Sequence, residues 1–441
     1  MTAQPHICQV AFSALHAFAL RRWYHEVFNL LYAGQTVFFP PATSNVQGLP
    51  GAWERCGWLV DGQDYFQLEF FQFLYPESRP TRQRHAFDIG YRVLGIYCAD
   101  FEGVLGRAVR FGGRQLEPVN GERPEREVVL EDPEGNRLRV FETDPLRTST
   151  PLLRPEMKTA VRSMTLSVPE LDEAVDSFSR AFGLAQQGDT RLNGDDARPR
   201  RALLHADNFI LELIEHPAPQ PWPDHYRISD QGFMNIAIGY RDAEQFDRAF
   251  AVACDAGFTP NGKPTEIGVF KVMYVNSPQG FSVEMLAARK RFWRLSGFKP
   301  VCAYLENTVW IDAPLARVWQ YVTDHQNMGM WCLFNGTVVQ PGSGDANGLD
   351  AVRQLSFAGL RVTERITRWQ PNESFSYSLV AGAPLKNHRG DIMLCSVHGG
   401  TELRWSVRFD AVIPCTGTIM AWGLKWIFAR ALQRLKQQLE S

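Results

Sequence analysis

The chain contains a long-range internal repeat, and this repeat limits the folds open to it more than any other feature. A strand predicted at 9–13 and a helix predicted at 16–28 recur in the same order at 163–168 and 170–182. The second copy begins 154 positions after the first. A repeat on this scale indicates duplicated structural units, so the first two thirds of the chain is expected to be modular.

Each copy is itself doubled. Strands predicted at 88–93 and 235–240 lead into further helices, and the turns at 132–135 and 277–280 carry Pro and Gly where a tight turn needs them. A predicted strand closes every unit, at 66–71, 137–141, 209–214 and 281–285. The sequence therefore predicts four strand-helix-strand-strand-strand units.

Paired units of this kind, with the sequence Asp-Pro-Glu-Gly-Asn at 132–136 before a closing strand, resemble the vicinal oxygen chelate superfamily. That superfamily includes glyoxalase I, bleomycin-resistance proteins and extradiol dioxygenases. The resemblance covers about residues 5–290. It implies an α+β fold with two tandem domains of paired βαβββ modules, at 1–150 and 151–295, each curled into an open cup.

The pattern changes after residue 300. A strand at 305–311, a helix from 313, several alternating strands and a final helix at 418–439 predict an antiparallel sheet wrapped on a helix. The segments 311–314, 364–366 and 399–401 resemble the START-like (SRPBCC, polyketide cyclase and lipid-transport) superfamily. This resemblance implies a helix-grip domain at 300–441 that encloses an apolar cavity for a hydrophobic small molecule.

In the chelate superfamily, metal ligands come from the first and last strands of the modules in a cup. The matched positions are Gln9, Glu69, Asp88 and Arg139 in the first predicted cup, and Ser163, Glu212, Asn235 and Glu284 in the second. None of them is histidine. An iron site with two imidazoles and one carboxylate is therefore disfavoured, and dioxygenase chemistry with it.

The carboxylates at these positions share strand faces with apolar residues, so each must be paired, protonated or bound to a cation. In the first cup we favour an ion pair between Arg139 and either Glu69 or Asp88 over a metal site. Arg139 is also a candidate substrate-binding residue.

In the second cup, Glu212 and Glu284 have no basic residue at a matched position. Together with Asn235 they could form an all-oxygen site for Mg, Mn or Ca. The alternative is one proton shared by two neighbouring carboxylates, an arrangement that supplies a general acid or base near neutral pH. Both alternatives make Glu212 and Glu284 candidate catalytic residues, and Asn235 a candidate ligand to the metal or the substrate.

The C-terminal domain supplies a second candidate site. Trp405 lies on the apolar face of its predicted strand and is, with Tyr377 and His388, a candidate substrate-binding residue. Glu364 shares a strand face with apolar neighbours. A carboxylate facing the cavity would have a raised pKa and could act as a general acid or base, with Tyr377, His388 and Asp324 as candidate partners. The alternative is a structural ion pair of Glu364 with Arg353 or Arg389.

Charge and composition exclude several function classes. Lys and Arg number 46 against 48 Asp and Glu, so no broad basic field is present to bind nucleic acid. The N-terminus lacks the features of a secretory signal, which predicts a cytoplasmic protein. The apolar segment 419–432 is interrupted by Lys425 and Arg430, so no membrane span is expected.

These observations favour a metabolic enzyme acting on a hydrophobic, oxygen-bearing small molecule such as a polyketide or aromatic intermediate. The chemistry expected is acid-base or metal-assisted cyclisation, dehydration, isomerisation or a lyase step. The alternative is a non-catalytic protein that binds, carries or sequesters a hydrophobic compound. A third interpretation makes the first cup a structural relic that forms a homodimer.

Overall fold

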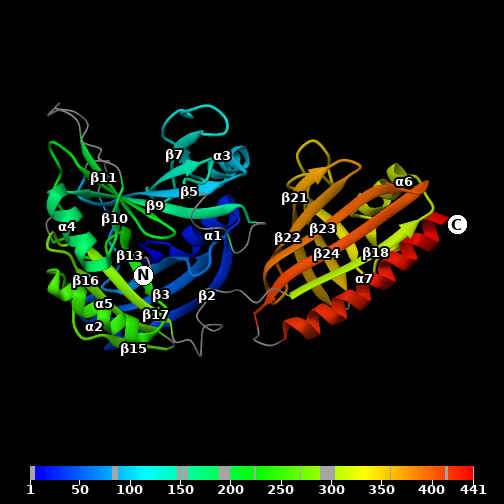
Figure 1. Cartoon of the computed structure of the whole chain (residues 1–441). Helices are drawn as coiled ribbons and strands as arrows, with labels where there is room; N and C mark the ends of the chain where they lie inside the picture. Colours follow the sequence, from blue (N-terminus) through cyan, green and yellow to red (C-terminus); the bar gives the residue numbers. More distant parts are fainter. Residues whose placement is uncertain are drawn as a thin grey trace. The chain divides into compact units, whose positions relative to one another are not determined.

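A computed structural model describes residues 5–81, 88–146, 152, 157–187, 199–222, 225–268, 270–288, 303–357, 359–412 and 416–440. The chain divides into two compact units, Met1–Lys299 and Pro300–Ser441. Figure 1 shows each unit with its elements labelled. The predicted α+β class is confirmed for both units.

The first unit consists of four βαβββ modules, as the repeat predicted. The first two modules comprise β1 (Ile7–Ser13), α1 (Ala17–Phe28), β2 (Leu31–Phe38), α2 (Ala42–Gln47), β3 (Trp53–Val60), β4 (Gln67–Tyr75), then β5 (Gly90–Cys98), α3 (Phe101–Arg110), β6 (Arg114–Gln115), β7 (Glu127–Glu131) and β8 (Arg137–Phe141). The last two comprise β9 (Thr159–Val168), α4 (Leu171–Phe182), β10 (Ala185–Gln186), β11 (Arg200–His205), β12 (Ile210–Glu215), then β13 (Gly232–Tyr240), α5 (Ala243–Asp255), β14 (Thr259–Pro260), β15 (Thr265–Ile267), β16 (Phe270–Asn276) and β17 (Ser282–Ala288).

Two sheets are formed, and each combines modules that are not consecutive. The outer-module sheet has the order β14-β16-β17-β13-β1-β4-β3-β2 and joins the first module to the fourth. The inner-module sheet has the order β10-β11-β12-β9-β5-β8-β7-β6 and joins the second to the third. The predicted pairing of consecutive modules, with a division between cups near residue 150, is therefore wrong. Because β1 is buried on both faces, its sequence does not indicate which strand lies beside it.

The helix ends follow the predicted signals. α4 presents one apolar stripe to the core and ends where Gly183 takes a left-handed conformation, with φ of 69°. α1 ends in the same way at Asn29, with φ of 57°. Both helices are stopped by a residue type that tolerates positive φ.

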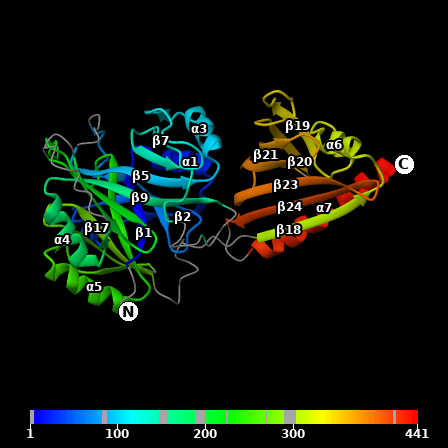
Figure 2. The same cartoon turned by 45° about the horizontal axis from the view of Figure 1, so that its top comes forward.

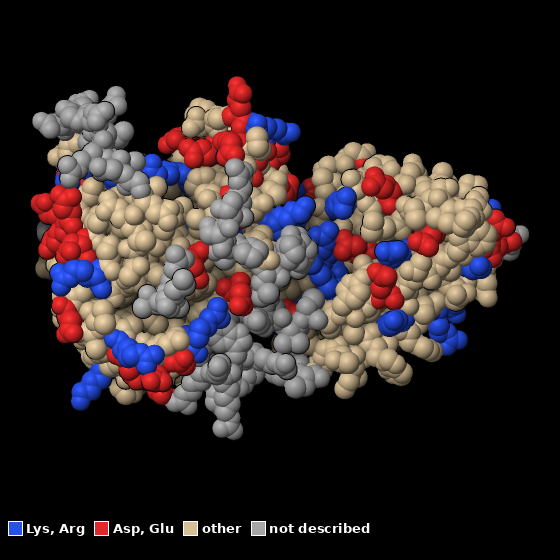
Figure 3. All heavy atoms as spheres, in the orientation of Figure 1, with Lys and Arg blue, Asp and Glu red and all other residues tan. Residues whose placement is uncertain are grey.

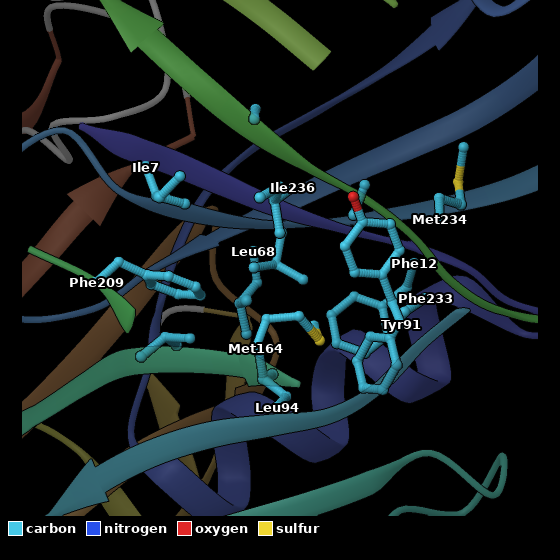
Figure 4. Packing of buried hydrophobic residues seen from close by; sticks show 14 of the residues in the cluster. Ile7, Phe12, Leu68, Tyr91, Leu94, Met164, Phe209, Phe233, Met234 and Ile236 are labelled. Carbon is cyan, nitrogen blue, oxygen red and sulfur yellow. The ribbon is translucent and has the colours of Figure 1, made fainter. Parts of the chain in front are cut away.

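The core of the first unit lies between the two sheets. Figure 4 shows Ile7, Phe12 and Leu68 of the outer-module sheet facing Leu94 and Met164 of the inner-module sheet. Since side chains from four modules fill this single layer, the four modules form one packed body.

The second unit is a seven-stranded antiparallel sheet with a long helix packed along it (Figure 2). Its elements are β18 (Ala303–Ile311), α6 (Leu315–Thr323), the short 3-10 helix Met328–Met330, β19 (Asn335–Gln340), β20 (Val352–Phe357), β21 (Leu360–Gln370), β22 (Ser374–Ala381), β23 (Leu385–Val397), β24 (Gly400–Ala411) and α7 (Gly417–Glu440). The predicted apolar face of β24 is buried, including Leu403, Trp405 and Phe409. This is the predicted helix-grip architecture.

On the face shown in Figure 3, acidic and basic side chains are interspersed. Within the described ranges, none of the helices is long and apolar enough to cross a bilayer. Six of the eight cysteines lie in the described ranges, and all six are free thiols.

Candidate functional site

The outer-module sheet brings four polar positions together at its centre. β1 and β13 pair antiparallel, so that Gln9 and Asn235 occupy equivalent places on the two strands. β4 pairs parallel with β1 and β17 pairs parallel with β13, and these strands add Glu69 and Glu284 in equivalent places. A local two-fold relation between the first and fourth modules thus assembles two amides and two carboxyl groups.

Hydrogen bonds join Gln9, Glu69 and Glu284 into one network. Nε2 of Gln9 donates to Oε2 of Glu69 at 2.5 Å and to Oε2 of Glu284 at 2.7 Å. Nε2 of Gln67 donates to Oε1 of Gln9 at 2.5 Å, and Nε1 of Trp58 donates to Oε1 of Glu69 at 2.7 Å. One amide group therefore bridges two buried carboxyl groups.

A third carboxyl group lies nearby, and it was not singled out from the sequence. Glu54 on β3 is fully buried and accepts a hydrogen bond from Nε2 of Gln47 at 2.7 Å. Burial raises its pKa well above the usual range of a glutamate. The alternation along β3 places Glu54 on the same face as Trp58, the kind of pattern that indicated Glu69 on β4.

Burial also governs protonation of the bridged pair. It raises the pKa of Glu69 to about 7. The pKa of Glu284 is raised well above its usual range, first by burial and then by the charges of Glu69 and Glu54. At neutral pH the cluster therefore retains protons, the state from which a carboxyl group can give or take a proton.

The three carboxyl groups line a pocket with largely apolar walls. Strands from both the first and the fourth module contribute, together with α2. Among the described residues that line it there is no Lys or Arg. The apolar and aromatic walls are Phe38, Val46, Trp58, Phe71, Ile267, Phe270, Val272, Tyr274 and Leu286.

The residues of the site also fit a hard divalent cation. Within the described ranges, no group of three or more His, Cys, Asp or Glu side chains is placed to hold a metal, so amide oxygens would have to complete the ligand set. The Asn235 amide is fully buried, and it interacts with the side chain of Tyr274, which lines the pocket. Carboxylate and amide oxygens are ligands that suit Mg²⁺, Mn²⁺ or Ca²⁺.

The predicted grouping of Glu212 with Glu284 and Asn235 is wrong. Glu212 lies on β12 in the inner-module sheet, whereas Glu284 and Asn235 lie in the outer-module sheet. Glu212 also has basic partners, contrary to expectation: Nη1 of Arg139 lies 3.4 Å from it, and Arg201 forms a second ion pair. A buried carboxylate held by two guanidinium groups is a structural feature.

The first predicted cup is not formed either. Arg139 neutralises Glu212 and not Glu69 or Asp88. Asp88 precedes β5 and forms an isolated bridge with Gln220. In the pairing of β5 with β9, a β-bulge between Tyr91 and Val93 separates Asp88 from the position on β5 that corresponds to Gln9 on β1.

In the second unit the structural alternative for Glu364 is observed. Nε and Nη2 of Arg353 donate to Oε2 of Glu364 at 3.0 and 2.8 Å, and both side chains are buried. Nη1 of Arg353 also contacts Nδ1 of His325 at 3.0 Å. Arg389 pairs with Asp391 and not with Glu364.

Two of the three candidate partners, Tyr377 and His388, lie close to this pair, together with Trp405. Nε1 of Trp405 donates to the Tyr377 hydroxyl at 2.8 Å, and the Arg353 guanidinium lies 4.6 Å from the Tyr377 ring centre. The His388 ring is 5.8 Å from that of Tyr377, and burial lowers the pKa of His388. Asp324 instead accepts hydrogen bonds from Asn327.

Comparison with known protein families agrees with the fold of the second unit. Residues 303–440 match the family described as polyketide cyclase/dehydrase and lipid transport. The C-terminal unit is a domain of this family. The four modules and two sheets of the first unit confirm the vicinal oxygen chelate fold that the sequence resembled.

Solved structures similar to the chain share little sequence with it. Glyoxalase I from Zea mays aligns over 64% of this chain and 92% of its own, with 15% identity and a TM-score of 0.46. The Aha1 dimer from Colwellia psychrerythraea aligns over 31% of this chain and 96% of its own, with 19% identity and a TM-score of 0.26. No curated protein matches the sequence.

The first unit thus contains one polar centre in which burial raises the pKa of the carboxyl groups, and a second in which Glu212 is paired with arginine. Gln9, Glu69, Asn235 and Glu284 were all matched from the sequence, but two were assigned to each cup. Gln67 and Trp58, which complete the hydrogen-bond network, were missed. Gln67 stands two positions before Glu69 on the same face of β4, and this alternation was the signal that could have found it.

Proposed function

We propose that the chain is an enzyme that transfers protons on an apolar, oxygen-bearing small molecule bound in the pocket of the outer-module sheet. Glu69 and Glu284 are the acid-base pair. The observation that carries this proposal is the bridging of two buried carboxyl groups by the Gln9 amide in a pocket lined by no basic side chain. Isomerisation, dehydration and lyase reactions all use such a pair.

The two carboxyl groups would have different roles, Glu69 as the base and Glu284 as the acid. Ionised Glu69 takes a proton from a carbon next to the substrate carbonyl, and the electron pair moves toward the carbonyl oxygen. Glu284, which holds its proton more tightly, returns a proton to the substrate. The Gln9 amide keeps both carboxyl groups aimed at the same substrate, and the apolar walls exclude water from the intermediate.

A divalent ion, if bound, would be held by Glu69 and Glu284 with the amide oxygens of Gln9 and Asn235. It would polarise the substrate oxygen as a Lewis acid. Gln9 would present its oxygen to the ion after rotation of its amide, whose two ends have nearly the same shape.

The proposal is tested without knowing the substrate by measuring enzyme-catalysed deuterium exchange. Small ketones and 2-oxo acids are incubated with the protein in D₂O, and loss of the proton next to the carbonyl is followed by NMR. The double variant Glu69→Gln, Glu284→Gln should lose at least about 100-fold in exchange rate, the lower end of the usual acid-base contribution. Metal content is measured on the same samples by mass spectrometry.

Glu212→Gln is the matched control, because Glu212 occupies the position equivalent to Glu69 in the inner-module sheet but is paired with arginine. It should exchange protons at the wild-type rate. Equal rates in the wild type and the double variant would refute the assignment of this pair.

A second candidate function is non-catalytic binding or carriage of a hydrophobic compound by the C-terminal unit. The ion pair of Glu364 with Arg353 favours it, because a carboxylate already held by arginine is a poor proton acceptor. In this case Glu364→Gln would leave any proton exchange unchanged, and binding of an apolar compound would persist in the Glu69→Gln, Glu284→Gln double variant.

A further inference from the structure

The first unit has a second cavity, distinct from the pocket lined by Glu54, Glu69 and Glu284, which we call the carboxyl pocket. Its volume is about 300 Å³, which lies at the lower limit of sites that hold small molecules. Its wall is formed by the end of α2, by residues of β5, β13, β16 and β17, and by residues 222 and 226–228. Gln47 lines both cavities, whereas Glu69 and Glu284 line only the carboxyl pocket.

Four aromatic residues are among those that line this second cavity, which we call the aromatic cavity: Tyr91, Trp222, Tyr226 and Phe281. The rings of Trp222 and Tyr226 stack with centres 4.3 Å apart, and Phe281 lies 6.1 Å from Trp222. The backbone is shaped to admit the indole, because Gly90 has a φ of 121° and a Cβ there would lie 2.8 Å from Trp222. Flat rings at such a wall are the usual partners of another flat ring.

The fourth aromatic ring, Tyr91, is fixed in place. Its hydroxyl donates to the Ser282 carbonyl at 2.8 Å, and its ring is buried in the core layer seen in Figure 4. The wall is therefore preorganised on the Tyr91 side, which lowers the entropy lost when a ligand binds.

The charge at the rim favours an anion. None of the described residues that line the aromatic cavity is acidic, and the one cation among these described residues is the exposed Arg227. Within the described ranges Arg227 forms no ion pair through its guanidinium. Asn261 and Asn276 add two amide groups to the lining, and Nδ2 of Asn276 donates to Oδ1 of Asn261 at 2.7 Å.

We propose that this cavity binds a flat aromatic carboxylate, with its ring against Trp222 and Tyr226 and its carboxylate on Arg227. A guanidinium group recognises a carboxylate with two parallel hydrogen bonds, and it also tolerates a ring stacked beside it. The site is separate from the acid-base pair, so it does not depend on the proposed function.

The test is calorimetric titration of the full chain with 2-naphthoate and, as the uncharged analogue, 2-naphthamide. The wild type should bind naphthoate about tenfold more tightly than naphthamide, the contribution expected of one charge-assisted contact. Arg227→Gln should abolish this difference, and it perturbs an exposed residue only. Trp222→Leu should weaken binding of both compounds by about tenfold or more.

Trp53→Leu is the matched control, because Trp53 is another partly exposed tryptophan of the same unit and lies outside the cavity. It should bind both compounds as the wild type does. Absence of saturable binding, or wild-type binding by Arg227→Gln, would overturn the proposal. Loss of binding in Glu284→Gln would place the ligand in the carboxyl pocket and would overturn it too. Circular dichroism of each variant checks that it is folded.

Discussion

Replacing Glu69 with glutamine should make the first unit more stable at neutral and alkaline pH. The folded protein holds the Glu69 proton more tightly than the unfolded chain does, because burial raises its pKa from 4.5 to about 7. The free energy of unfolding therefore falls as pH rises from about 4.5 to about 7, and is constant on either side of that window with respect to this group.

The size of the effect follows from the shift. About 2.5 pKa units correspond to about 3.5 kcal/mol at 1.4 kcal/mol per unit. Glutamine resembles the protonated carboxyl group and does not titrate, so the variant lacks this loss. With an unfolding entropy of about 2 cal/mol/K per residue over residues 1–299, the variant should gain about 5 °C in melting temperature between pH 4 and pH 8 relative to the wild type.

The assay is scanning calorimetry of the wild type and Glu69→Gln across pH 4 to 9, with the transition of the first unit compared at each pH. Glu212→Gln serves as the control. That substitution should lower the melting temperature, since it leaves the guanidinium groups of Arg139 and Arg201 without their carboxylate. A melting-temperature difference between Glu69→Gln and the wild type that does not change with pH would refute the reasoning.

Two further predictions concern the C-terminal unit. Arg353→Met should destabilise it by about 3 to 5 kcal/mol, because it leaves the buried Glu364 carboxylate unpaired, and Arg353→Met with Glu364→Leu should recover most of this loss; thermal unfolding of both variants measures it. Tyr377→Phe should cost about 1 to 3 kcal/mol by removing the acceptor of the buried Trp405 indole N–H, with chemical denaturation as the measurement and Tyr304→Phe, an exposed tyrosine, as the control.

The sequence predicted the modules because each carries local signals. The apolar stripe of α4, its end at Gly183 and the apolar alternation of β24 are all properties of neighbouring residues. These segments fold as predicted because their own side chains decide which face is buried.

The pairing of modules could not be predicted in this way. β1 and β9 are buried along almost their whole length, so they carry no polar face that would identify a partner strand. The wrong pairing of modules also led to a wrong grouping of the candidate site residues. Glu212 and Glu284 were placed together because their modules are adjacent in sequence, yet the sheets bring Glu284 to Gln9, which is 275 positions away.

The second unit shows a different limit. The strand pattern placed Glu364 correctly on a buried face, and it named Arg353 as one of two candidate partners. The choice between Arg353 and Arg389 depended on which strand lies beside β21. β20 lies there and presents Arg353 directly opposite Glu364.

The nesting of the modules has a consequence for the order in which the first unit can be completed during synthesis. Every strand of the inner-module sheet lies between residues 90 and 215, whereas the outer-module sheet needs strands from both sides of that span. The inner sheet can therefore close while the strands at 7–75 still lack half of their partners. The carboxyl pocket cannot exist until residue 284 has left the ribosome, so a chain cut short after three modules would carry Gln9 and Glu69 beside an open sheet edge.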